Sequence, residues 1–180
     1  EKKETGHVRE WLNQFNGVRE QRLMFKLLKN LRFYTQVQVR EAVRTIHSRV
    51  KTRRVHKEGE RKRRDILLSA FGNVDKSDSS LARTYRQEND IFHKNITGRD
   101  KLASLFKKED SDRIRALVFV DDIFGSGTQK SDALKKLNED LGIVLASRDI
   151  KVYITAICGF RDGIERIERE AQKTDFDTEV

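Results

Sequence analysis

The sequence predicts an α/β fold, an open and mainly parallel sheet with flanking helices, preceded by a helical N-terminal region. Three short apolar runs support the sheet, since they are continuous, as in parallel strands buried on both faces: residues 66–71, 116–120 and 152–158. Segments with the three- or four-residue spacing of helices lie between these runs. The chain of 180 residues has the length of one ordinary domain, so we expect one core.

The N-terminal part is predicted to be helical. Apolar residues recur three or four positions apart between Val8 and Phe33, which fits either two amphipathic helices or one helix kinked near Gly17. A further helix is expected over residues 37–50, although the alternation at residues 37–39 leaves a strand possible there. We favour the helix.

The remaining segments alternate between strand and helix. The first strand ends at Gly72-Asn73, a pair typical of turns, and the helix after the second strand is expected to stop at Gly142. Helices that would connect one parallel strand to the next, or follow the last one, are predicted at residues 80–92, 98–106, 131–141 and 162–171. This order predicts βαβ winding, and ligands of such sheets lie beyond the carboxyl ends of the strands.

Positive charge is concentrated in the N-terminal part. Residues 1–64 hold 19 Lys and Arg against 7 Asp and Glu, whereas residues 65–180 hold 19 against 22. We therefore divide the chain into a basic helical region, 1–64, and an α/β core, 65–180. The densest stretch, residues 49–64, could attract nucleic acid or a protein partner. No aromatic residue interleaves its charges as base stacking would require, so a solvated surface is the simpler interpretation.

Cysteine and histidine usage excludes several kinds of site. A single cysteine, Cys158, excludes a disulfide within the chain, and no long apolar run or signal-peptide pattern is present. We therefore expect a soluble protein of the cytoplasm, with no membrane partner. The four histidines lack the spacing of metal ligands. A first residue other than Met is compatible with a piece of a longer protein.

The residues that carry chemistry follow the second strand. Asp121 and Asp122 come directly after it, and a helix follows a loop of small and polar residues, Gly125, Ser126, Gly127, Thr128 and Gln129. Such a loop offers backbone N–H groups, hydroxyl donors and the positive end of a helix dipole to a phosphate. The carboxylates can accept hydrogen bonds from sugar hydroxyls or help to hold Mg2+, so a phosphorylated sugar suits both halves. A Walker A loop is excluded, because Gln129 stands where that motif needs a glycine before Lys130.

Residues 118–129, V-F-V-D-D-I-F-G-S-G-T-Q, resemble the signature of the type I phosphoribosyltransferases. That signature has four apolar residues, two acids, two apolar residues and a five-residue loop, and the twelve residues correspond to all of its positions but the first. The resemblance implies that Asp121 and Asp122 are the catalytic acids, engage the ribose of phosphoribosyl pyrophosphate and help to hold Mg2+. It also implies that residues 125–129 cradle the 5′-phosphate. Two positions depart from the pattern: Gly125 replaces an Asp that assists the base in some purine-salvage members, and Gln129 replaces the usual Thr or Ser.

The resemblance extends to the loop after the first strand, and the chain looks most like the phosphoribosyltransferase-like domains of bacterial conflict and antiphage systems. It implies that Lys76 and Ser77 bind pyrophosphate, with help from Arg83 and Arg86. Asp78 follows Lys76-Ser77 where those domains usually carry Gly, and their C-terminal continuation is not present. A plain surface turn is the alternative for this loop.

Three functions remain open. The first is an enzyme that uses phosphoribosyl pyrophosphate and Mg2+ to transfer or remove the phosphoribosyl group. The second is a catalytically inactive, nucleotide-sensing or regulatory module of a bacterial defence system. The third is a protein that binds nucleic acid or a partner through its basic N-terminal region. Release of pyrophosphate would distinguish the first from the second, and a steep dependence of nucleic-acid affinity on salt would support the third.

Overall fold

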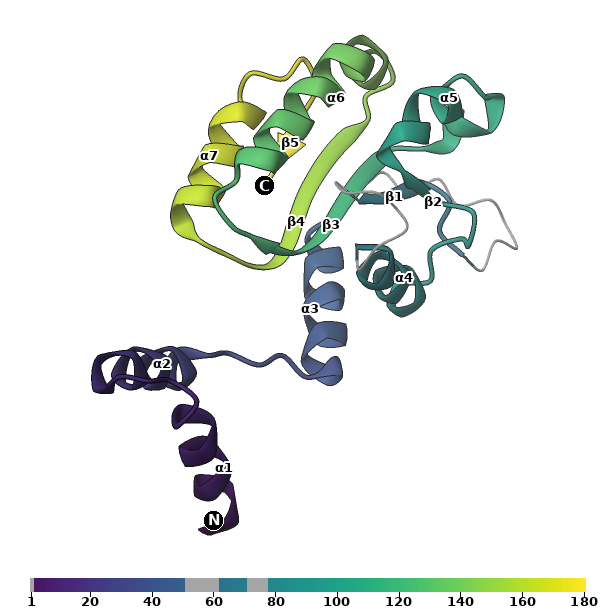
Figure 1. Ribbon diagram of the computed structural model, residues 1–180. Helices are drawn as coiled ribbons and strands as arrows, with labels where there is room; N and C mark the ends of the chain where they lie inside the picture. The colour runs from purple at the N-terminus through teal and green to yellow at the C-terminus, as the bar shows by residue number, and fades with distance from the viewer. Residues whose placement is uncertain (1, 51–61, 71–77) are drawn as a thin grey trace. The chain divides into compact units, whose positions relative to one another are not determined.

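The computed structural model of the protein describes residues 2–50, 62–70 and 78–180 (Figure 1). By its internal contacts the chain separates into two units, Glu1–Thr35 and Gln36–Val180. The division at residue 64 into a basic region and a core rests on the charge distribution alone. It stays a prediction. Most of the basic stretch 49–64 lies outside the described residues.

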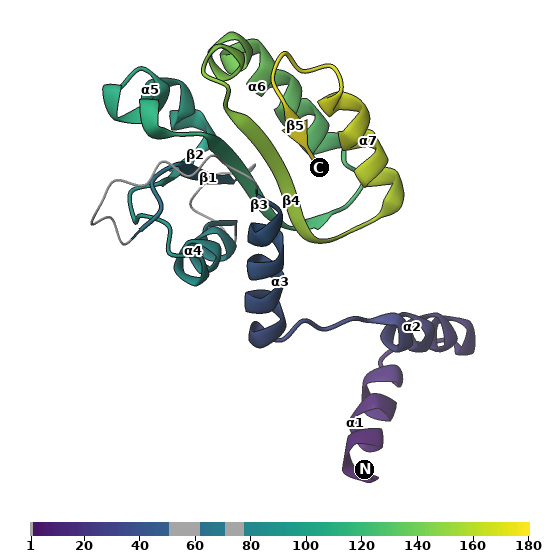
Figure 2. The same cartoon turned by 180° about the vertical axis from the view of Figure 1, so that it is seen from behind.

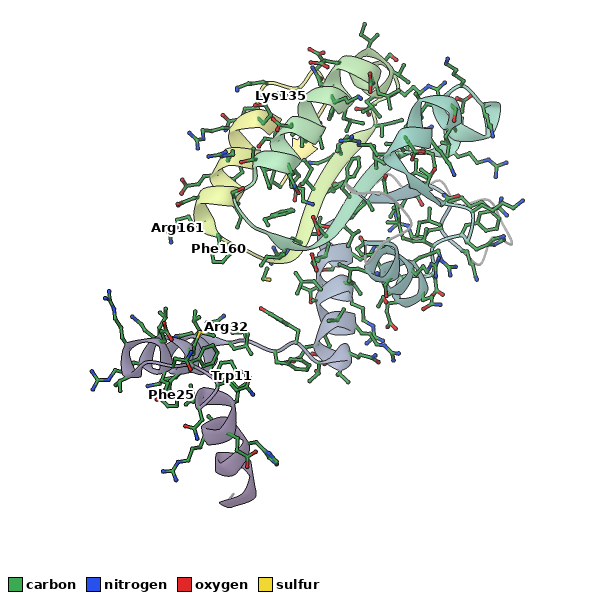
Figure 3. The ribbon with its side chains drawn as sticks, viewed as in Figure 1. Trp11, Phe25, Arg32, Lys135, Phe160 and Arg161 are labelled. Carbon is green, nitrogen blue, oxygen red and sulfur yellow. The ribbon has the colours of Figure 1, made fainter. Side chains whose placement is uncertain are left out.

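The N-terminal unit contains two helices, α1 (Lys2–Leu12) and α2 (Val18–Asn30). They are separate because Gly17 is extended, with φ −133° and ψ 145°, which decides between the two alternatives that the spacing leaves open. The rings of Trp11 and Phe15 meet edge to face at the end of α1, with their centroids 5.2 Å apart. Trp11 is labelled in Figure 3.

The second unit begins with α3 (Gln36–Arg49), so the prediction of a helix here is confirmed and the alternative strand is wrong. Val43 of this helix and Val50, directly after its end, are both buried against the sheet, and Ile46 packs beside them. Val37, on which the alternation depends, is 64% exposed. Burial of one helical face therefore overrides the local β-like pattern.

The sheet has five strands, all parallel, in the order β2-β1-β3-β4-β5. The predicted strands correspond to β1 (Ile66–Ala70), β3 (Ala116–Phe124) and β4 (Lys151–Gly159). Two edge strands were not predicted, β2 (Ile96–Gly98) and β5 (Thr178–Glu179), because two or three residues carry too little pattern. The helix predicted at residues 98–106 is correspondingly shorter, since η1 (Arg99–Lys101) and α5 (Leu102–Phe106) follow β2.

Helices cover both faces of the sheet (Figure 1 and Figure 2). On one face, Leu67, Leu117 and Ile154 pack in a core with α5, α6 (Thr128–Ser147) and α7 (Arg161–Ala171). On the other face, Leu68 and Val118 pack with α3 and α4 (Asp78–Glu88). The remaining short helix, η2 (Glu109–Arg113), precedes β3. Because successive side chains of a strand point to opposite faces, continuous apolar runs supply both cores.

Helix α6 continues through Gly142, so the prediction that it stops there is wrong. Gly142 is buried, and a Cβ at this position would lie 2.8 Å from Asn138 Oδ1 and 2.9 Å from Asp175 Oδ2. The side chain of Asn138 and the backbone N–H of Asp175 are hydrogen-bonded at 2.9 Å. The glycine therefore makes room for a close approach rather than ending the helix.

Four polar side chains join α3, α4 and the start of β1, and we call them the amino-end network: Arg63, Asp65, His47 and Tyr85. Arg63 donates to both carboxylate oxygens of Asp65, at 3.1 and 2.6 Å. Its Nη1 lies 3.2 Å from His47 Nε2, and His47 Nδ1 lies 3.1 Å from Tyr85 Oη. Since an arginine only donates, Nε2 accepts and a neutral His47 carries its proton on Nδ1. Burial raises the pKa of Tyr85, which keeps its hydroxyl protonated.

Candidate functional site

The strand order places the carboxyl ends of β1 and β3 next to each other at a switch point of the winding. From β1 the chain crosses to β2 on one side, and from β3 it crosses to β4 on the other. Ligands of open α/β sheets bind outside the carboxyl ends of the strands at such a point. The loop after β1, with the predicted ligands Lys76 and Ser77, lies outside the described residues. The candidate site is therefore described from its β3 side.

The two predicted acids lie within β3, because the strand continues past Val120 to Phe124 and pairs with β4 along this length. The prediction that the strand ends before Asp121 is therefore wrong. Asp121 is buried, with 5% of its surface exposed, whereas Asp122 is exposed. The backbone N–H of Asp122 donates to Asp121 Oδ1 at 2.9 Å. The structure thus gives the two acids different surroundings.

A lysine neutralises the buried acid. Lys130 lies in the first turn of α6, directly after the loop, and its Nζ forms an ion pair with Asp121 Oδ2. Partial burial raises the pKa of Asp122, and so do the hydrogen bond and the negative charge of Asp121. A hydrogen-bond donor or a cation that approached Asp122 would oppose this effect and favour its ionised form.

The loop of residues 125–129 turns sharply into α6 and packs on the start of α7. Gly127 has φ +76°, and a Cβ there would lie 2.4 Å from the carbonyl oxygen of Gly163. A Cβ on Gly163 would in turn lie 2.0 Å from the carbonyl oxygen of Gly125. Both positions therefore require glycine, and the contact fixes the loop against α7. Figure 3 labels Phe160, which connects the end of β4 to α7, and Arg161, the first residue of α7.

Hydroxyl groups line the loop. Ser126, Thr128 and Gln129 are exposed, and Ser126 Oγ donates to Thr128 Oγ1 at 3.2 Å. Thr128 opens α6, and its backbone N–H donates to Ser126 Oγ at 3.5 Å. The N–H groups of Gln129 and Lys130 follow in the same first turn, where a helix provides no backbone acceptor for them, and they are available to an anion. In the same turn Ser131 is buried, and its hydroxyl has no hydrogen-bond partner among the described residues. These groups form a cluster of donors suited to an anion.

Two basic residues at this site were not predicted. Arg166 of α7 donates from Nη1 to Thr128 Oγ1 at 2.6 Å, across 38 residues of sequence. The only sequence signal for it is its spacing of three from Gly163, which places both on one side of a helix. Lys130 was considered only as the lysine of a Walker A loop. Lys130 pairs with Asp121 because β3 continues past Val120 and holds Asp121 within the strand. The apolar run of residues 116–120 does not indicate this continuation.

The carboxylates of the site suit a metal ion that binds together with a phosphorylated ligand. The described residues contain no group of three or more His, Cys, Asp or Glu that could hold a metal by themselves. Mg2+ is commonly held by one or two carboxylates together with phosphate oxygens of a substrate, and the exposed Asp122 matches that pattern. The other predicted metal ligand, Asp121, already has a partner at each carboxylate oxygen, and its role at a metal stays a prediction. Arg83 and Arg86 lie on α4, on the opposite face of the sheet from α6. Their role at a pyrophosphate stays a prediction.

Comparison with known proteins supports the resemblance to phosphoribosyltransferases noted for residues 118–129. It extends this resemblance over most of the chain. No curated protein and no solved structure matches this sequence. Among the described helices, none has both the length and the apolar character needed to span a bilayer. A family model described as PRTase-CE matches residues 8–180, which include α2, α3 and the whole sheet. The chain therefore belongs to the PRTase-CE family, the phosphoribosyltransferase-like domains of conflict systems.

Proposed function

We propose that the protein binds a phosphorylated ribose, with phosphoribosyl pyrophosphate as the first candidate, at the carboxyl ends of β1 and β3. One observation carries this proposal: the exposed carboxylate of Asp122 and the donor groups of the 125–129 loop lie at the switch point of the sheet. A carboxylate suits sugar hydroxyls and a cluster of N–H and O–H donors suits a phosphate. The family membership of the chain supports the same ligand.

The residues divide the work of binding. The 125–129 loop and the first turn of α6 hold the 5′-phosphate through backbone N–H groups and the Thr128 hydroxyl. Asp122 accepts hydrogen bonds from the ribose hydroxyls, while the ion pair with Lys130 holds Asp121 in place. Asp122 is the acid that would hold Mg2+, whose chemistry would be to neutralise charge on the departing pyrophosphate. Both carboxylate oxygens of Asp121 already have partners, so its part is to support Asp122. In this proposal, Lys76 and Ser77 bind the pyrophosphate.

The reaction requires little covalent chemistry from the protein. The bond from C1′ to the pyrophosphate oxygen breaks with both electrons on that oxygen, and an acceptor or a water molecule forms the new bond to C1′. The positively charged sugar between these events is stabilised by fixed charges and correct positioning. Gly125 supplies no carboxylate, so the first loop position does not assist a nucleobase. The proposed activity is therefore transfer or removal of the phosphoribosyl group, with an acceptor that does not need this acid.

A catalytically inactive sensing module is the second candidate. It is favoured by the ion pair of Lys130 with Asp121, because a carboxylate that is already neutralised contributes less negative charge to a reacting sugar. A place in a bacterial defence system is part of both proposals, and membership of the PRTase-CE family supports it. Binding of nucleic acid or a partner through residues 49–64 stays a prediction from charge.

Calorimetric titration of phosphoribosyl pyrophosphate with Mg2+ tests the proposal. We expect saturable binding to the wild-type chain and at least about tenfold weaker binding to Asp122→Asn, because a hydrogen bond to a charged group is lost. Asp132→Asn, an exposed acid on α6, is the matched control and should bind like the wild type. Absence of binding to the folded wild-type protein would overturn the proposal. Pyrophosphate release after binding would favour the enzyme, and binding without release the sensor.

A further inference from the structure

Helix α7 presents a cation to the 125–129 loop. Arg166 is exposed, and its Nη1 donates to Thr128 Oγ1 at 2.6 Å. Gly163, one helical turn earlier, packs directly on the backbone of the loop, at a distance that leaves no room for a Cβ. The backbone contact thus fixes α7 against the loop, and the spacing of three brings Arg166 to the same side of the helix. The position of this guanidinium is set by packing.

The hydrogen bonds around Thr128 leave one proton available. A hydroxyl offers one O–H donor and two acceptor lone pairs. The Thr128 oxygen accepts from Ser126 at 3.2 Å and from Arg166 at 2.6 Å, which uses both lone pairs. Within the described part of the chain, the Thr128 O–H has no acceptor. A ligand placed here would therefore meet a donor, and an oxygen that only accepts is its natural partner.

Arg166 adds further donors and a charge without an ion-pair partner among the described residues. A guanidinium has five N–H donors, and the structure uses one of them on Thr128. No carboxylate in the described residues lies within ion-pair distance of Arg166, although the nearby Lys173 and Lys135 both pair with Glu170. Planar guanidinium groups bind phosphate oxygens in pairs, which a lysine or a hydroxyl cannot do. Thr128 and Arg166 therefore form one donor surface.

We propose that Arg166 is a further ligand-binding residue of the site, which contacts the 5′-phosphate and selects phosphorylated ribose over ribose. The inference rests on the proposed function and deepens it. Arg166 supplies two further N–H donors to the phosphate, and its hydrogen bond orients the Thr128 hydroxyl proton toward the same group. The sugar alone gains nothing from either contact.

Calorimetric titration with ribose 5-phosphate and with ribose tests this role in the full chain. We expect Arg166→Ala to bind ribose 5-phosphate roughly 10- to 100-fold more weakly than the wild type, and Arg166→Lys to lie in between. The matched control is Arg169→Ala, an exposed arginine of the same helix that donates from Nε to the Glu165 carbonyl. This control should bind within about twofold of the wild type. Binding of ribose should be equally weak in all four proteins.

The outcomes distinguish the two proposals. Wild-type binding of ribose 5-phosphate with equal affinity in Arg166→Ala would overturn the role of Arg166 and leave the proposed function standing. An equal loss in Arg169→Ala would also overturn it, because only general charge would then matter. Absence of saturable binding of both ribose 5-phosphate and phosphoribosyl pyrophosphate to the wild type would overturn the proposed function and, with it, this inference. Thermal unfolding checks the fold, and if Arg166→Ala is unfolded, Arg166→Lys decides by the same comparison.

Discussion

The two ends of the central sheet each contain a buried aspartate paired with a cation, yet they differ in what surrounds the pair. At the amino end, the side chains of Arg63 and Asp65 are 12% and 3% exposed and the amino-end network surrounds them. At the carboxyl end, Lys130 and Asp121 are similarly buried, at 17% and 6%, but an exposed acid, Asp122, and a loop of donors adjoin them. The first pair serves stability. The second pair adjoins the surface at which we propose that a ligand binds.

The largest effect is expected at the amino end. Asp65→Ala should lower the free energy of unfolding by about 3–5 kcal/mol, since it leaves the Arg63 guanidinium buried without its carboxylate. Urea unfolding measures this loss. Glu139→Ala, an exposed acid on α6, should change the free energy of unfolding by less than about 0.5 kcal/mol. Similar values for the two variants would show that the amino-end network does not carry stability.

A smaller loss of stability is expected from a change at the contact between α7 and the 125–129 loop. Gly163→Ala should cost about 1–3 kcal/mol, because the added Cβ would lie 2.0 Å from the carbonyl oxygen of Gly125 and the backbones must separate. In contrast to Asp65→Ala, this variant should also lose binding of ribose 5-phosphate. Gly125→Ala is the stability control, since nothing lies within 4 Å of its Cβ. If Gly163→Ala were as stable as this control, the contact between α7 and the loop would not exist in solution.

The two neighbouring acids, Asp121 and Asp122, allow a buried and an exposed carboxylate to be compared within one site. Asp121→Asn removes the charge that pairs with Lys130 and should cost about 1–2 kcal/mol in urea unfolding. Asp122→Asn should leave stability unchanged or slightly higher, because burial and the charge of Asp121 disfavour the ionised form of Asp122. Equal destabilisation by the two substitutions would contradict the division into a structural and a ligand-facing acid.

The smallest effect concerns pH. The raised pKa of Asp122 means that the folded protein binds this proton more tightly than the unfolded chain does, so the stability from it is fully present below the ordinary value of 3.8. That stability is lost as the pH rises through the raised pKa. Urea unfolding over a pH series should therefore show the wild type losing stability relative to Asp122→Asn in this range. A difference that stays constant with pH would argue against the raised pKa.

Some parts of the fold and of the candidate site are predictable from the sequence, and others are not. The three long strands and the position of the 125–129 loop are predictable because continuous apolar runs and glycines are local signals. The edge strands β2 and β5 are too short to show a pattern, and their place depends on pairing with β1 and β4. The contact of Arg166 with Thr128 depends on how α7 packs on the loop, and the spacing of Gly163 and Arg166 shows only that the two residues share one side of the helix. The different environments of Asp121 and Asp122 follow from the continuation of β3 into polar residues.

Backbone amide chemical shifts during titration with ribose 5-phosphate test the central claim most directly, because they report on both ends of the sheet at once. The account predicts that the amides of Gly125 to Lys130 shift in a saturable way, while those of Arg63 to Asp65 at the amino end do not. Saturable shifts confined to other parts of the chain, or none at all with a folded protein, would contradict the assignment of the ligand site to the carboxyl end of β3.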